Sequence, residues 1–235
     1  MPIGVPKVPF QYSEDDDELW VDLYNRLYRE RVLFLCQELG EELSNQLIGI
    51  MLYLNAEDEA AEEEANKKAK KKRKKTRKKR LKSMNIIDTK FEIKDVHIYI
   101  NSPGGSAIAG IALYDAMEYI RAAVNTICAG LASSTATLIL SNGFMGNRIA
   151  LSHSRIMLRQ PVGRVKGQTQ DLWGEIRQVE HLRQIIGILF ADKTAQPLNK
   201  VSADLDRNLY LSASTAKIYG LVDKIAYQLE LALFA

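Results

Sequence analysis

The chain of 235 residues is 46% hydrophobic, with 32 basic and 29 acidic residues, and this composition predicts a globular protein with one large core. No apolar run approaches the roughly 20 residues that span a bilayer, and residues 1–12 lack the pattern of a secretory signal, so we expect neither membrane insertion nor export. Only Cys36 and Cys128 are present, and their apolar neighbours predict two buried thiols in a reducing compartment.

The N-terminal part of the chain predicts a helix, a short strand and a second helix between Trp20 and Leu54. In the second helix, apolar residues such as Leu47 and Met51 recur at helical spacing. We divide the chain into an N-terminal segment, residues 1–19, and a single domain, residues 20–235, interrupted by an insertion at residues 56–90.

The insertion is a block of segregated charge. Residues 67–82 hold 13 of the 32 basic residues, and residues 57–64 hold 6 of the 29 acidic ones, which leaves 19 basic and 23 acidic residues elsewhere. Runs of like charge repel one another and stay solvated, so we expect a surface insertion that is helical at most in part. Binding of nucleic acid by the basic run is the alternative, which the lack of interleaved aromatic residues disfavours.

Beyond the insertion, strand-like and helix-like segments alternate. Strands are predicted at residues 95–100 and 124–131, then within 147–152 and 155–161, and helices at 107–123, 132–143 and 170–193, followed by a last strand and helix unit at 210–226. Strands separated by helices predict parallel crossovers and therefore an α/β fold.

Two motifs suggest chemistry. The turn "NSPGGS" follows a strand and places Gly104 and Gly105 where backbone amides can approach a ligand and stabilise an oxyanion, although such a turn is also common without function. The run "CAGLASSTATL" leaves little bulk at a strand-to-helix junction, so Ser133 or Ser134 is either an exposed nucleophile or a helix N-cap. Spacing alone does not choose between these interpretations.

Together, the ordered motifs "INSPGG", "ICAGLASSTATLIL", "RIALSHSRIMLRQP" and "DRNLYLSASTAKIYGLVD" resemble the proteolytic subunit of the ATP-dependent Clp protease. The opening "MPIGVPKVPF" resembles the version encoded in plastid genomes, which needs no transit peptide. The similarity covers nearly the whole chain outside the insertion.

The resemblance implies particular site residues. The family's serine nucleophile falls on Ser134, and its oxyanion donors fall on the backbone amides of Gly105 and Thr135, which we expect to survive any side-chain change. The family's general base is the histidine of "Met-Ile-His-Gln-Pro", a position that holds Arg159 here, and its orienting aspartate falls on Asn208. A guanidinium stays protonated at any working pH and cannot take the serine proton. Loss of the base costs roughly a million-fold in kcat in proteases of this type.

No other side chain is expected to replace the missing base. His153 lies six residues before Arg159 along a predicted strand, some 20 Å away at about 3.3 Å per residue. His97 and His181 belong to other elements, and Lys166 is the nearest lysine in sequence for a serine–lysine pair, an arrangement that we discount.

The family implies a crotonase-like α/β fold of repeated ββα units and stacked seven-membered rings of related subunits. Unfolded proteins enter such a barrel through a Clp ATPase chaperone, which uses the ATP, so no cofactor or metal is expected for this chain. We therefore expect a plastid stromal subunit of the serine endopeptidase complex whose own site is impaired. The alternatives are a fully active protease subunit with an atypical base and a nucleic-acid-binding protein. An acyl-CoA enzyme on the same scaffold is discounted, because no carboxylate follows the glycine turn before Asp115.

Overall fold

The computed structural model describes residues 4–10, 19–77, 93–163 and 166–226, with no side chain described for residues 66 and 68–77. Its centre is a seven-stranded sheet in which β3, β4, β5, β6 and β9 follow one another, β7 pairs with β5, and β8 pairs with β7. The pairs are parallel except for β7 with β8. The strands of this sheet are β3 (Val32–Leu35), β4 (Val96–Ser102), β5 (Val124–Ser133), β6 (Arg148–Leu151), β7 (Arg155–Leu158), β8 (Leu209–Ser212) and β9 (Lys224–Ala226). The prediction of an α/β fold with parallel crossovers is confirmed.

Strand β5 pairs with two different strands along one of its edges. Its first half pairs with β6 and its second half with β7, while β4 runs along the other edge. Gly130 lies between the two halves with a φ of 114°, and a Cβ atom there would come within 2.8 Å of the Asn101 Oδ1 atom. Glycine is required at this point because the strand bends where it changes partner.

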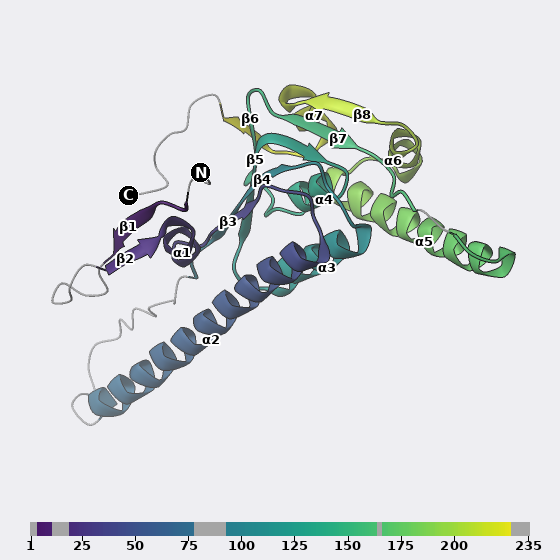
Figure 1. Ribbon diagram of the computed structural model, residues 1–235. Coiled ribbons are helices and arrows are strands. Elements are labelled where there is room, and N and C mark those ends of the chain that lie inside the picture. The colour runs from purple at the N-terminus through teal and green to yellow at the C-terminus, as the bar shows by residue number, and fades with distance from the viewer. Residues whose placement is uncertain (1–3, 11–18, 78–92, 164–165, 227–235) are drawn as a thin grey trace.

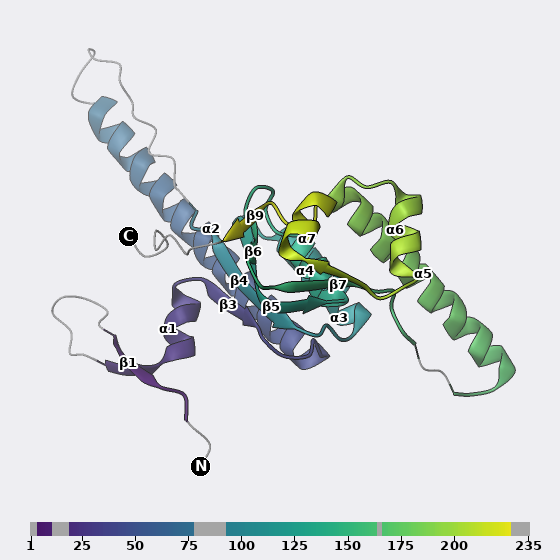
Figure 2. The same ribbon diagram turned by 90° about the horizontal axis from the view of Figure 1, so that it is seen from above.

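The helices are α1 (Leu23–Arg29), α2 (Glu41–Arg77), α3 (Ala107–Tyr119), α4 (Thr135–Ser141), α5 (Thr169–Thr194), α6 (Leu198–Leu205) and α7 (Ala213–Tyr219). Inner turns of α2 lie beside α3 against the sheet, while its outer turns project from the body, and α5 projects at the opposite end (Figures 1 and 2). A separate hairpin, β1 (Lys7–Phe10) and β2 (Leu19–Asp22), and helix α6 were not predicted. Within the described ranges, no helix is both long and apolar enough to cross a bilayer.

The core forms between the sheet and the helices from residues at the predicted periods. Along β4, Val96, Ile98 and Ile100 are fully buried, and in β3 the alternate residues Leu33 and Leu35 are. Cysteine 36 follows Leu35, so its side chain takes the opposite direction and is exposed, whereas Cys128 in β5 is buried. The prediction of two buried thiols is therefore wrong for Cys36, because the apolar run ends one residue before it.

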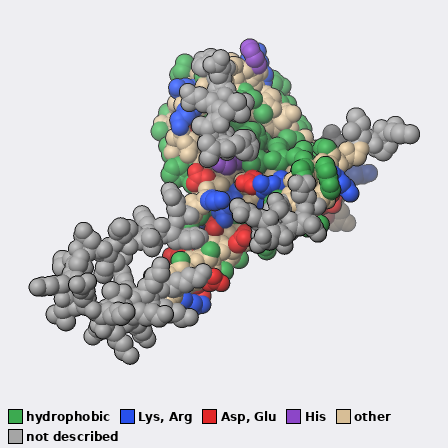
Figure 3. Space-filling model, turned by 90° about the vertical axis from the view of Figure 1, so that its left-hand side faces the viewer, with side chains coloured by type: hydrophobic (Ala, Val, Ile, Leu, Met, Phe, Trp, Pro, Cys, Tyr) green, Lys and Arg blue, Asp and Glu red, His purple; other side chains and the backbone are tan. Residues whose placement is uncertain are grey.

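Helix α2 continues through the acidic part of the insertion. Asp58 is only 4% exposed and accepts two hydrogen bonds from Arg31, at 2.8 Å and 2.5 Å, and these bonds raise the pKa of the arginine. One turn further along, Glu62 forms an exposed ion pair with Arg121, whose backbone amide also donates to the Asn55 side chain. The view in Figure 3 shows acidic and basic side chains next to one another where α2 leaves the body. The first two turns of the predicted insertion are thus packed onto the domain, and residues 78–90 lie outside the described ranges.

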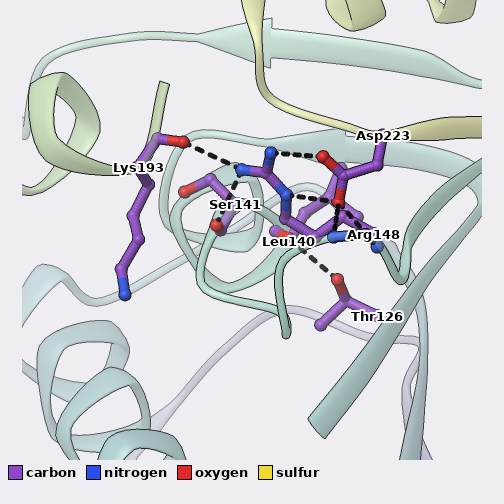
Figure 4. Close-up of polar contacts among 7 residues, drawn as sticks. Thr126, Leu140, Ser141, Arg148, Lys193 and Asp223 are labelled. Atoms are coloured by element: carbon purple, nitrogen blue, oxygen red, sulfur yellow. Dashed lines mark hydrogen bonds and ion pairs between the residues drawn. The ribbon is translucent and has the colours of Figure 1, made fainter. Parts of the chain in front are cut away.

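A second ion pair, formed by a buried arginine and a half-buried aspartate, links the C-terminal unit to the rest of the domain. The Arg148 side chain, 3% exposed, donates to both carboxylate oxygens of Asp223 and to the carbonyls of Ser141 and Lys193 (Figure 4). Burial raises the pKa of Asp223, but the hydrogen bonds from Arg148 and from the Gly146 amide outweigh burial and lower it below its ordinary value. One arginine therefore ties together β6, the ends of α4 and α5, and the residue that precedes β9.

Candidate active site

The candidate site is a cleft of about 530 Å³ at the C-terminal ends of β4, β5 and β7. Ligand sites of open parallel sheets lie at such strand ends. Its lining includes the glycine turn Pro103–Ser106, the junction Ser133–Thr135, the segment Arg159–Val162 after β7, and side chains from one face of α5. Four of the five residues assigned by resemblance, namely Ser134, Gly105, Thr135 and Arg159, line this one cleft.

Ser134 occupies a strained turn between β5 and α4. Its φ of 55° and ψ of −118° are uncommon for a residue with a side chain and cost roughly 1–3 kcal/mol. The Ser134 amide donates to the Met157 carbonyl at 2.9 Å, and the Thr137 hydroxyl lies 2.9 Å from both that carbonyl and the Ala132 carbonyl. These bonds hold the turn so that the serine is presented at the junction, as nucleophilic serines are at other sharp strand-to-helix turns.

The structure separates the two serines that spacing left undecided. Ser133 is 4% exposed, and its hydroxyl points to the Met157 sulfur at 3.7 Å. Ser134 is half-buried, and although it stands at the N-cap position of α4, its side chain makes no capping hydrogen bond. Ser134 therefore occupies the N-cap position without capping the helix through its side chain.

The glycine turn is fixed by backbone contacts to Leu39. The Leu39 amide donates to the Gly104 carbonyl, the Leu39 carbonyl accepts from the Ser106 amide, and both distances are 2.9 Å. A Cβ atom on Gly105 would lie 2.2 Å from the Leu39 carbonyl oxygen, so no other residue fits there without a shift of the main chain. The turn therefore holds the Gly105 amide in one position beside Ser134.

Arg159 and Asn208 flank the last paired residues of two antiparallel strands. Strands β7 and β8 pair Leu158 with Leu209, Arg159 directly follows Leu158, and Asn208 directly precedes Leu209. Both residues are exposed, and neither side chain has a hydrogen-bond or ion-pair partner among the described residues. Asn208 does not line the cleft, so the structure brings together four of the predicted site residues and sets the fifth next to Arg159.

No histidine or lysine of the described residues lines the cleft. His153 lies in the turn before β7, at the far end of that strand from Arg159. In α5 the lining residues are Val179, Leu182 and Ile186, and His181 lies about 200° around the helix from Val179. The described residues also contain no group of three or more His, Cys, Asp or Glu side chains placed to hold a metal.

One contact in the cleft was missed by the sequence argument. The Gly105 amide, expected to be a free oxyanion donor, donates to the Thr135 hydroxyl at 3.0 Å. A side-chain hydroxyl of the same chain thus reaches an amide that was expected to act independently of side-chain identity. The signal in the sequence is the hydroxyl residue directly after Ser134, and nothing in the spacing shows that it folds back onto the glycine turn.

Comparisons with known proteins agree with this architecture. Residues 15–63 and 68–228 match the Clp protease family. The "ATP-dependent Clp protease proteolytic subunit" of Oltmannsiellopsis viridis is 50% identical over 226 residues, which cover 96% of this chain and 99% of the relative. Proteins of the same name from Chlorella vulgaris (50% over 226 residues, 96% of each chain) and Marchantia polymorpha (42% over 229 residues, 97% of each) are also similar. This chain belongs to the Clp protease family, as its motifs predicted.

Proposed function

We propose that this chain is a subunit of the ATP-dependent Clp serine endopeptidase of the plastid stroma, and that its own active site is impaired. In this proposal it joins related subunits in stacked seven-membered rings. A Clp ATPase chaperone delivers unfolded proteins to the barrel, and neighbouring subunits with a complete triad cleave them.

The observation that supports an impaired site is the composition of the cleft. A serine hydroxyl needs a base to take its proton, and the side chain that follows β7 beside Ser134 is the permanently charged Arg159. No histidine of the described residues lines the cleft to replace it. Asn208, at the position of the orienting carboxylate, is neutral and has no histidine to orient.

The retained fold supports a structural contribution. The strained turn at Ser134 and the glycine turn are held by backbone hydrogen bonds, which do not require the family's histidine or aspartate. A subunit with this scaffold can close a ring and form part of the wall of the degradation chamber without cleaving a peptide bond itself.

The test is labelling of the assembled particle with a serine-reactive fluorophosphonate, with mass spectrometry of the peptide that contains Ser134. We expect no adduct on Ser134 while the nucleophilic serines of sibling subunits are labelled, because phosphonylation needs the same activated hydroxyl as peptide cleavage. A Ser134 adduct that forms at the rate of the siblings would show that another group activates this hydroxyl, and the proposal would be abandoned.

A further inference from the structure

The Thr135 side chain packs against Gly104 and Gly105 of the cleft and against Gly110 of α3. Thr135 is 4% exposed, and its hydroxyl accepts the hydrogen bond of the Gly105 amide at 3.0 Å. A Cβ atom added to Gly104 would lie 3.1 Å from the Thr135 hydroxyl, and one added to Gly110 would lie 3.0 Å from its Cβ and 3.1 Å from its methyl group. The methyl group is therefore packed toward α3, and the hydroxyl is directed at the glycine turn.

The Thr135 side chain has little freedom to leave the amide. It is buried and β-branched, and both features restrict its χ1 rotation. The neighbouring polar groups of the turn have other partners, because the Gly104 amide donates to the Ser102 hydroxyl and the Gly104 carbonyl accepts from Leu39. The bond between Gly105 and Thr135 thus completes the hydrogen bonding of the turn from within the chain.

We propose that the Thr135 side chain closes the oxyanion hole of this subunit by occupying the Gly105 amide. This inference rests on the proposed assignment of Ser134 as the nucleophile position, and it adds a second defect that is independent of the lost base. An oxyanion donor acts only if its N–H is aimed at the oxygen that gains charge, and here the N–H is aimed at a hydroxyl of the same chain. The backbone amide of Thr135 remains as the other donor.

The inference predicts that restoring the triad alone is not sufficient. In a particle whose chain carries Arg159→His and Asn208→Asp, the restored base can take the Ser134 proton, but the anionic oxygen on phosphorus or carbon meets one donor instead of two. Loss of one oxyanion donor costs about 10²–10³-fold in kcat. We expect Ser134 in this restored chain to react with the fluorophosphonate about 10²–10³-fold more slowly than the siblings.

The deciding comparison adds Thr135→Ala or Thr135→Ser to the restored chain. Alanine removes the hydroxyl and frees the Gly105 amide, so we expect the labelling rate of Ser134 to rise about 10²-fold or more. Serine, like alanine, lacks the methyl group of threonine, but it keeps the hydroxyl. The labelling rate of Ser134 in the serine variant should therefore stay near that of the restored chain. Equal rates for the alanine and serine variants, or a sibling-like rate without any change at Thr135, would overturn the inference.

Two further measurements keep this inference separate from the proposed function. The unaltered chain, labelled in parallel, tests the proposed function alone, because rapid labelling there would contradict an impaired site whatever the variants do. Hydrogen–deuterium exchange of the peptide that contains Gly105, in otherwise unaltered particles, needs no activity. Thr135→Ala should speed exchange of this amide and Thr135→Ser should not, and an amide that exchanges equally fast in all three chains would contradict the closed oxyanion hole.

Discussion

The buried pair of Arg31 and Asp58 makes the strongest prediction for stability. The side chains are only 10% and 5% exposed, and Arg31, two residues after the end of α1, has a φ of 62°, a strained conformation for arginine. Its guanidinium also donates to the Lys94 carbonyl at 2.8 Å. Asp58→Asn removes the charge that compensates the buried guanidinium, and breaking a buried pair in this way costs about 3–5 kcal/mol.

The assay is urea denaturation followed by far-UV circular dichroism, with Glu62→Gln as the matched control. Asp58 and Glu62 lie one turn apart on α2, and each pairs with an arginine from another element, but the pair of Glu62 with Arg121 is exposed. We therefore expect a large fall in the urea midpoint for Asp58→Asn and almost none for Glu62→Gln, with an unchanged slope. A fall for Asp58→Asn no larger than that of the control would refute the claim that burial makes the difference.

Three further changes test other parts of the structure. Because Arg148 lowers the pKa of Asp223, the pair stabilises the fold above the ordinary carboxylate pKa, and this stabilisation is lost as pH falls. Asp223→Asn should therefore be less stable than the unaltered chain at pH 6–7 and should lose less further stability on acidification, as measured by urea midpoints against pH. Ser134→Gly should raise the free energy of unfolding by about 1 kcal/mol, since glycine adopts a positive φ without strain, whereas Ser134→Ala should not; equal effects would argue against strain. Gly105→Ala should lower the unfolding free energy by about 1–3 kcal/mol, because its Cβ would meet the Leu39 carbonyl, and full stability would mean that the turn yields easily.

The sequence was sufficient to predict those helices and strands that follow from hydrophobic periodicity and composition. Strands β4 and β5 and helix α5 lie within a few residues of their predicted limits, because each combines a long apolar period with a clear turn at its end. The order of motifs was sufficient to place Ser134, Gly105 and Arg159 in one cleft. Helix α6 was missed, since its eight residues Leu198–Leu205 give too short a pattern to stand out.

What the sequence did not predict depends on contacts between distant residues. The acidic residues of the insertion looked like a solvated run, yet Asp58 is buried because Arg31 stands 27 positions earlier with a guanidinium that requires a partner. Likewise, the bond between Gly105 and Thr135 joins residues 30 positions apart, and no sequence pattern around either residue indicates it. Local periodicity carries no information about either pair, since both arise only when separate elements meet.

Helix α2 has the mechanical character of a cantilever. Its inner turns lie beside α3 and are fastened by Arg31 and Arg121, whereas from Glu62 to Arg77 the helix extends for about 22 Å without the body beside it (Figure 1). A stiff helix that is held at one end keeps the direction set by the contacts at that end. The direction in which α2 projects the start of the basic segment is therefore set by the buried pair at Asp58 and the surface pair at Glu62. Loss of these pairs would redirect the projecting turns without changing any residue in them.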